Sequence, residues 1–235
     1  MTTEPTLIGD RGFESISLHR RVRCEPDFLE SLLPAFQNPK VKLAYSNSHV
    51  MDQHGNVTGD YTTCEYLTSL SNSKWTRNYC VTAQEEINDG LGVKNTILSA
   101  SAAVFRRFEL TPEKCAVLET MRLAGDWFLF THAIADGNVS YTARKLNYHR
   151  RHSESVIGKL VRQNRVTELF GEFYCVQSEI FSRYQLRDCF EGKWERYLRD
   201  QWHAFYPERP FDDLKSCYPF DQARAQIVSA GLAGL

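Results

Sequence analysis

The stretch AGDWFLFTHAIADGNVSYTARKLNYHRRH, from Ala124 to His152, decides the fold of this chain. Its first part is a short apolar run that begins with Gly125 and Asp126, and we predict a helix closed by Gly137. The residues that follow alternate between apolar and polar, which is typical of a strand. A helix that leads directly into a strand, with more strand and helix patterns before it, predicts an α/β fold.

The segments before this stretch give further local predictions. Pro26 and the apolar residues after it predict a short helix that ends near residue 38, and alternation over 41–48 predicts a strand. A turn should follow, with Gly55 in a positive-φ conformation. We expect a long, partly irregular excursion over residues 57–93, a pair of strands over 95–107, and a helix over 111–121 with Thr111 as its N-cap.

Composition indicates an ordinary globular protein. Hydrophobic residues make up 42% of the 235 residues, and the formal net charge of -1 gives no global field that would attract nucleic acid. The seven cysteines are an odd number without a C-x-x-C pair, so we expect reduced thiols and a cytoplasmic location. No run approaches the ~18–20 apolar residues of a membrane span, so a peripheral position at the inner membrane face is the alternative.

Four blocks, at residues 25–36, 41–57, 95–107 and 123–156, resemble family 2 glycosyltransferases in their order and spacing. The resemblance covers the second, acceptor-side half of such an enzyme and implies a partial GT-A fold, a mixed sheet flanked by helices. The nucleotide-binding first half is expected to be missing, because the chain has neither an Asp-x-Asp element nor a glycine-rich phosphate loop. We therefore predict three parts: a leader over 1–24, the glycosyltransferase-like half over 25–153, and a helical extension over 154–235.

The resemblance implies that Asp126 is the general base of an inverting sugar transfer. It would take the proton of an acceptor hydroxyl while that oxygen attacks a nucleotide-diphosphate sugar, and a position at a helix N-terminus would keep the carboxylate ionised. The other implied roles are acceptor binding by Gly125, Trp127, Ser99 and Ser101, diphosphate binding by Arg150 and Arg151, and ligation of a divalent Mn or Mg ion by His152. Since strand neighbours face opposite ways, only one of the two arginines should reach the site.

Each of these residues also has a structural interpretation. Asp126 can be a helix-terminal acid, Trp127 a core residue, and the two serines a place where strands pack closely. The chain as a whole can be a non-catalytic carbohydrate-binding or scaffolding remnant, and RNA binding by the basic clusters is a weaker alternative. If the chain is a transferase, its partners are the sugar donor, a hydroxyl acceptor and a separate donor-binding chain. Alone, it should bind nucleotide diphosphates no more tightly than about millimolar.

Overall fold

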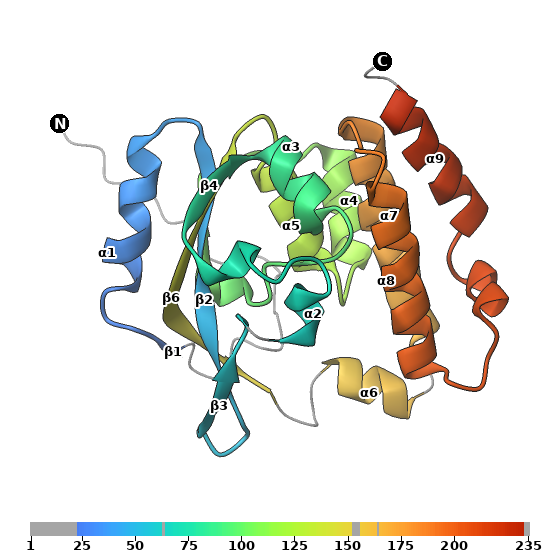
Figure 1. Cartoon of the computed structure of the whole chain (residues 1–235), viewed down its shortest axis with the longest axis horizontal. Coiled ribbons are helices and arrows are strands. Elements are labelled where there is room, and N and C mark those ends of the chain that lie inside the picture. The colour runs from blue at the N-terminus through green and yellow to red at the C-terminus, as the bar shows by residue number, and fades with distance from the viewer. Residues whose placement is uncertain (1–22, 63, 152–155, 164, 233–235) are drawn as a thin grey trace.

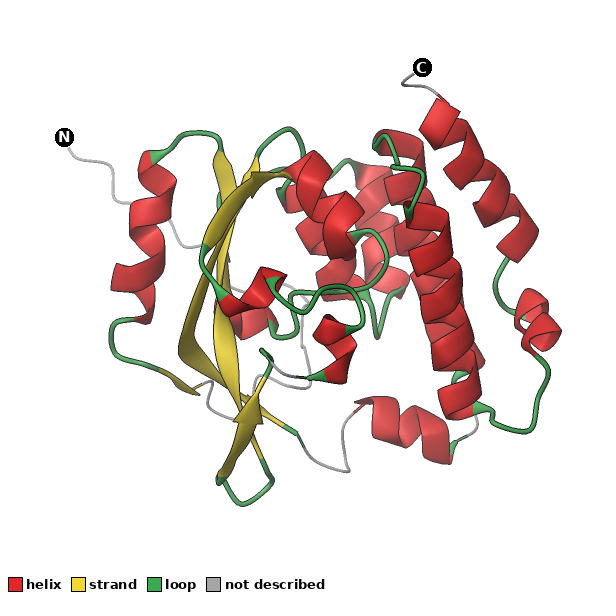
Figure 2. Cartoon of the chain, viewed as in Figure 1, coloured by secondary structure: helices red, strands yellow, loops and turns green. Residues whose placement is uncertain are grey.

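A computed structural model describes residues 23–62, 64–151, 156–163 and 165–232. These residues form a curled mixed sheet with helices on both faces, and the helices of the C-terminal third lie beyond one of those faces (Figure 1, Figure 2). The α/β class and the helical C-terminal region are therefore confirmed. The strands are β1 (Arg23–Cys24), β2 (Val41–Met51), β3 (Val57–Asp60), β4 (Tyr79–Thr82), β5 (Ala103–Phe105) and β6 (Asn138–Arg150).

The helices before the long β6 strand are short. They comprise α1 (Phe28–Leu32), η1 (Leu33–Gln37), α2 (Glu65–Thr68), η2 (Lys74–Thr76), α3 (Ala83–Glu86), the π-helical η3 (Ile87–Leu91), η4 (Ala100–Ala102), α4 (Pro112–Thr120) and α5 (Gly125–Ala133). Those after β6 include the three longest of the described helices, α7, α8 and α9. They are α6 (Val156–Arg162), α7 (Thr167–Arg183), α8 (Phe190–Phe205), η5 (Phe211–Ser216) and α9 (Phe220–Leu232).

Two long parallel strands organise the sheet. β2 pairs with β6 from Val41 opposite Asn138 to Met51 opposite Arg150. The far edge of β6 pairs antiparallel with β4 and β1, and the far edge of β2 pairs antiparallel with β5 and β3. Parallel neighbours need a crossover connection, and residues 52–137 provide it. That crossover carries most of the candidate site.

Alternation along β2 divides the apolar side chains between two faces. Leu43 and Tyr45 join the large core under α5 and the C-terminal helices, whereas Ala44 points to a small cluster with Phe28 and Leu146. In Figure 1 α1 covers the sheet face opposite the other helices, which agrees with this division. A period of two in the side-chain pattern thus places every second residue of β2 on the face that carries α5.

One prediction for the crossover is wrong. Residues 95–107 form no strand pair, because residues 95–99 have no regular structure and only β5 is extended. Residues 57–93 are partly irregular, with the short elements β3, β4, α2 and α3 between loops. Each of these four elements has only four residues, too few for a clear period.

The junction between α5 and β6 corrects the prediction that Gly137 closes the helix. Asp136 adopts the left-handed conformation there, with φ of 55°. Gly137 is required for space instead: a Cβ on it would lie 2.1 Å from Lys42 Cγ and 2.8 Å from the Lys40 carbonyl oxygen. The predicted Thr111 cap and the positive φ of Gly55 are both confirmed.

The C-terminal helices share one core with the sheet. Trp127 of α5 packs edge-to-face on Phe173 of α7, and Phe181 of α7 packs the same way on Trp194 of α8. The predicted boundary between residues 153 and 154 lies outside the described residues, as do residues 1–22 of the leader predicted over 1–24. The last two residues of that leader, Arg23 and Cys24, form β1 and pair with β6. Among the helices of the described segments, none combines the length and apolar character that a membrane crossing needs.

Candidate functional site

The predicted base, Asp126, lies in the first turn of α5, where the helix dipole favours a carboxylate. The loop before it is held from the C-terminal helices: the Glu172 carboxylate of α7 accepts the backbone N–H groups of residues 122, 123 and 124 at 2.8–2.9 Å. Three N–H groups that precede the helix are thereby satisfied. No local pattern in the sequence marks Glu172, although its carboxylate holds the loop from which α5 begins.

Asp126 is half-buried, and its environment favours the protonated form. Burial raises the pKa of its carboxyl group, an effect opposed by hydrogen bonds from backbone N–H groups and from the Asn95 side chain. The side-chain Oδ1 of Asn95 already accepts the backbone N–H of Ile97 at 3.1 Å. The side-chain Nδ2 is therefore the atom of Asn95 that donates to Asp126. Asp126 forms no ion pair with any of the described residues.

The segment that carries Asn95 is clamped by two helices. The indole N–H of Trp127 donates to the Leu91 carbonyl oxygen at 2.7 Å, and the Gln177 amide donates to that of Val93 at 2.7 Å. Trp127 is only 1% exposed, so its ring packs in the core and the prediction that it walls a sugar site is not met. Its physical role is to fix the loop that bonds Asp126.

A buried amine lies on the same segment. Lys94 is 3% exposed, and its Nζ donates to the Ser69 hydroxyl at 2.8 Å. The ammonium lies over the rings of Tyr66, 4.2 Å from the centroid, and Tyr197, 5.2 Å from the centroid. Burial lowers the pKa of Lys94 to about 8, while the charges of Cys64, Asp200 and Glu65 act in the opposite sense. No carboxylate among the described residues forms an ion pair with it.

Tyr66 connects this amine to the predicted site. Burial raises the pKa of the Tyr66 phenol, the negative charge of Asp126 raises it further, and the positive charge of Arg151 lowers it. Asp126 and Arg151 therefore act on one phenol. Arg151 also lies 5.7 Å from the centroid of the Tyr61 ring, whose hydroxyl hydrogen-bonds His149 Nδ1. Burial and the charge of Arg151 lower the pKa of His149 to about 4.

The two arginines at the end of β6 take different partners. Arg150 donates to the Gln53 carbonyl oxygen at 3.0 Å, in the turn between β2 and β3, whereas Arg151 lies over Tyr61. Their guanidinium groups thus separate, as alternation along an extended chain requires. The charge of Arg151 lowers the pKa of the Tyr66 phenol, which the charge of Asp126 raises.

The serines predicted for acceptor binding belong to a hydrogen-bond cluster on the sheet. Ser99 and Ser101 bond to each other at 2.8 Å, and both bond to the side chain of Asn147, which is fully buried. Their hydroxyls therefore hydrogen-bond β6 through the Asn147 side chain. Gly125 packs against α4, where a Cβ would lie 3.3 Å from Leu118 Cδ1.

The implied divalent metal finds no ligand set in the described residues. No three His, Cys, Asp or Glu side chains converge there, and Asp126 is a single carboxylate. His152, the predicted ligand, lies outside the described residues. The part of the chain that the structure describes does not fit the metal, and we assign no chemical step to it.

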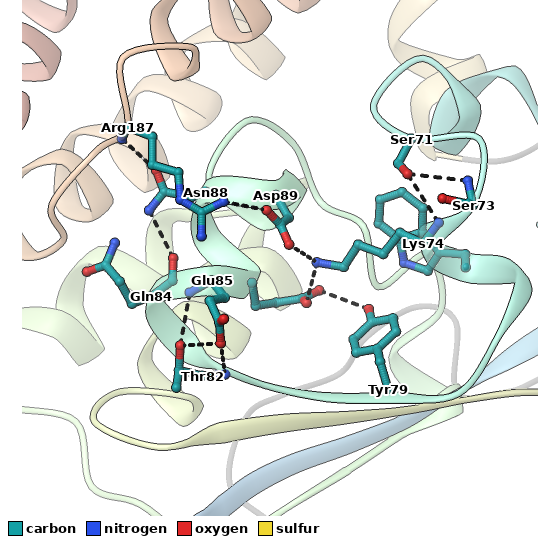
Figure 3. A network of polar contacts seen from close by, with 12 residues as sticks. Ser71, Ser73, Lys74, Tyr79, Thr82, Gln84, Glu85, Asn88, Asp89 and Arg187 are labelled. Atoms are coloured by element: carbon teal, nitrogen blue, oxygen red, sulfur yellow. Dashed lines mark hydrogen bonds and ion pairs between the residues drawn. The ribbon is translucent and has the colours of Figure 1, made fainter.

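A second buried charge cluster lies at the junction of β4, α3 and η3. Glu86 is fully buried, and Lys74 bridges it to Asp89 at 2.8 Å and 3.3 Å. Asp89 then pairs with Arg187 at 3.0 Å (Figure 3). The hydroxyls of Tyr45 and Tyr79 donate to the other Glu86 oxygen at 3.4 Å and 3.3 Å. Each charge in this cluster has a partner, so its role is to hold the crossover together.

Comparison with known proteins identifies no relative. No protein-family model matches the chain, and no curated protein matches it at a significant level.

Proposed function

We propose that this protein is an inverting glycosyltransferase of the family 2 type, or the acceptor-side half of one, with Asp126 as its general base. The observation that best supports this is the environment of the Asp126 carboxylate. Burial raises the pKa of its carboxyl group, the Asn95 side chain hydrogen-bonds it, and no described cation forms an ion pair with it. A buried carboxylate in this condition gains stability when it takes a proton, which is what a general base must do.

The reaction would be a single displacement. The acceptor oxygen attacks the anomeric carbon of a nucleotide-diphosphate sugar, the bond from that carbon to the diphosphate oxygen breaks, and the acceptor proton passes to Asp126. The diphosphate leaves with both electrons of the broken bond. Arg151, just after the end of β6, would supply a positive charge to offset the negative charge that develops on the leaving group.

A mixed sheet with helices on both faces is compatible with the second half of a GT-A fold. The donor nucleotide would then be held by a separate chain or segment, and the enzyme would act in the cytoplasm or at the inner membrane face. The acceptor is a carbohydrate or another hydroxyl compound.

The test is a transfer assay with nucleotide-diphosphate sugars and Mn or Mg, on this chain alone and with any donor-binding partner. Asp126→Asn keeps the shape of the side chain but removes the base, so we expect a loss of about 10²–10⁴-fold in kcat. Asp136→Asn is the matched control, because it makes the same change beyond the other end of α5 and asparagine tolerates the positive φ there.

Activity of Asp126→Asn within about threefold of wild type, with Asp136→Asn also active, would show that Asp126 is not the base. Sugar binding without transfer, equal in both variants, would favour the non-catalytic carbohydrate-binding module instead.

A further inference from the structure

A surface cavity of about 250 Å³ lies at the C-terminal end of α5, the end away from Asp126. It is bounded by the start of β2, by residues 106–109 after β5, and by the end of α7. At about 30 Å³ per water molecule its volume corresponds to roughly eight waters, enough for a phosphate and a few carbon atoms.

The lining of this cavity is strongly cationic. Four of its side chains are Lys42, Arg106, Arg107 and Arg183, and the one carboxylate is Glu109, which leaves a net charge of 4 − 1 = +3. Arg183 also pairs with Glu179, which does not line the cavity, at 3.9 Å. Arg106 is occupied by the carbonyl oxygens of residues 36 and 41 at 2.6 Å and 2.9 Å. The side chains of Lys42 and Arg107 form no hydrogen bond or ion pair with any described residue.

His132, which also lines the cavity, adds no positive charge to it, and Arg183 fixes its tautomer. Arg183 donates to its Nδ1 at 3.1 Å, and a guanidinium cannot accept, so the proton of the neutral ring is on Nε2. Nε2 is buried and has no hydrogen-bond partner among the described residues; the nearest carboxylate oxygen, on Glu179, is 4.0 Å away. Burial and the charge of Arg183 lower the pKa of His132 to about 4, so the ring is neutral at pH 7.

The helix itself does not account for so much positive charge. The C-terminus of a helix carries roughly half a negative charge, which a single cation would offset. The cations that remain repel one another unless an anion joins them, and guanidinium groups match the geometry of phosphate oxygens.

We propose that this cavity binds a phosphate dianion, either inorganic phosphate or the phosphate group of a small monoester. The site is separate from the proposed base, because the helix α5 lies between them. The phosphate-site proposal is therefore tested independently of the proposed transferase activity.

The experiment is calorimetric titration of the full chain with two probes, inorganic phosphate and glycerol 3-phosphate, in about 0.1 M salt, where screening suppresses non-specific attraction. The double variant Lys42→Met/Arg107→Gln should weaken phosphate binding on the order of tenfold, equivalent to ~1.4 kcal/mol. Glu109→Gln removes the opposing carboxylate and should tighten binding severalfold. Arg196→Gln, on the exposed face of α8, is the charge-matched control and should change nothing. Equal affinity for the two probes would indicate free phosphate, and tighter glycerol 3-phosphate a monoester.

The proposal is overturned if neither probe binds below about 10 mM, or if neither the double variant nor Glu109→Gln changes the affinity. Should the double variant fail to fold, the single variants Arg107→Gln and Glu109→Gln decide the matter, since both residues are exposed.

Discussion

Two lysines among the described residues, the buried Lys94 and the half-buried Lys74, each lie over a pair of aromatic rings. Lys74 lies 5.6 Å from the Trp75 ring and 5.0 Å from the Tyr79 ring, much as Lys94 lies over two tyrosines. The difference is in their anionic partners: Lys74 bridges two carboxylates, whereas Lys94 has one hydroxyl. Aromatic faces alone do not compensate for the lost hydration of an ammonium, which is why Lys94 has a lowered pKa.

The contrast between the two lysines separates a structural ion-pair cluster from the region of the candidate site. The paired lysine stabilises the crossover. The unpaired Lys94 is adjacent in sequence to Asn95, which bonds the other incompletely compensated charge, Asp126. Perturbed ionisable groups gather at functional sites more often than elsewhere.

The largest expected effect comes from breaking the paired cluster. Lys74→Met leaves Glu86 fully buried with two tyrosine hydroxyls but no cation, and loss of one partner of a buried ion pair costs about 3–5 kcal/mol. Urea unfolding at pH 7 should show a drop in the free energy of unfolding of this size. An unchanged value would mean that the Glu86 cluster is not structural.

The same substitution at the other lysine should have the opposite sign. Folding lowers the pKa of Lys94 from 10.5 to about 8, so it disfavours the protonated amine that is present at pH 7. At ~1.36 kcal/mol per pH unit, Lys94→Met should stabilise the protein by up to about 3 kcal/mol. In the wild type, stability should rise as the pH increases from about 8 towards 10.5, and this rise should be absent from the variant. A lower free energy of unfolding for Lys94→Met than for the wild type would contradict the predicted difference between the two lysines.

His149 extends the contrast to an imidazole that has a neighbouring cation but no carboxylate. Its pKa falls from 6.5 to about 4 on folding, so the unfolded chain binds more protons between these values. Stability should therefore fall as the pH drops below about 6.5, by up to about 1.4 kcal/mol per pH unit for this group. The pKa of His132 is lowered to about 4 as well and adds a similar slope, so His149→Gln should reduce the slope between pH 6.5 and 5 without abolishing it. His203→Gln, at an exposed position, should leave the slope intact. Parallel slopes in all three proteins would refute the prediction.

The smallest effect concerns Asp126. Because burial raises the pKa of Asp126 above its unfolded value, folding disfavours the carboxylate at neutral pH, and Asp126→Asn should leave the melting temperature equal or slightly higher. A clear drop would indicate that the charge is structural. Calorimetric melting at pH 7 measures this, with Asp136→Asn as the control.

Local patterns in the sequence are sufficient to predict the long elements. Alternation is clear over β2 and β6, and Thr111 with Pro112 marks the start of α4 in the way that caps usually do. The brief strands β3 and β4 carry no such pattern, and the expected strand at residues 95–99 is replaced by a loop that Gln177 and Trp127 hold from a distance.

The candidate site can be predicted only in part for a similar reason. The resemblance to family 2 glycosyltransferases points to Asp126, but the groups around the site come from distant parts of the chain. Glu172 reaches the loop before α5 from α7, and Tyr197, which lies beside Lys94, is more than 100 residues from Lys94 in sequence. Lys94 has no local signal, because it lies between Val93 and the polar Asn95. Contacts of this range have no local pattern.

The parallel pairing of β2 with β6 also has a consequence for biosynthesis. Val41 pairs with Asn138, so the partner lies 138 − 41 = 97 residues later in the chain. At ~5–20 residues per second, a ribosome needs about 5–20 s to make that interval. Throughout it, the apolar β2 can pair only with β3 and β5, and its other edge stays open to foreign strands. Slow, non-local closure of this kind makes the nascent chain a natural client for chaperones.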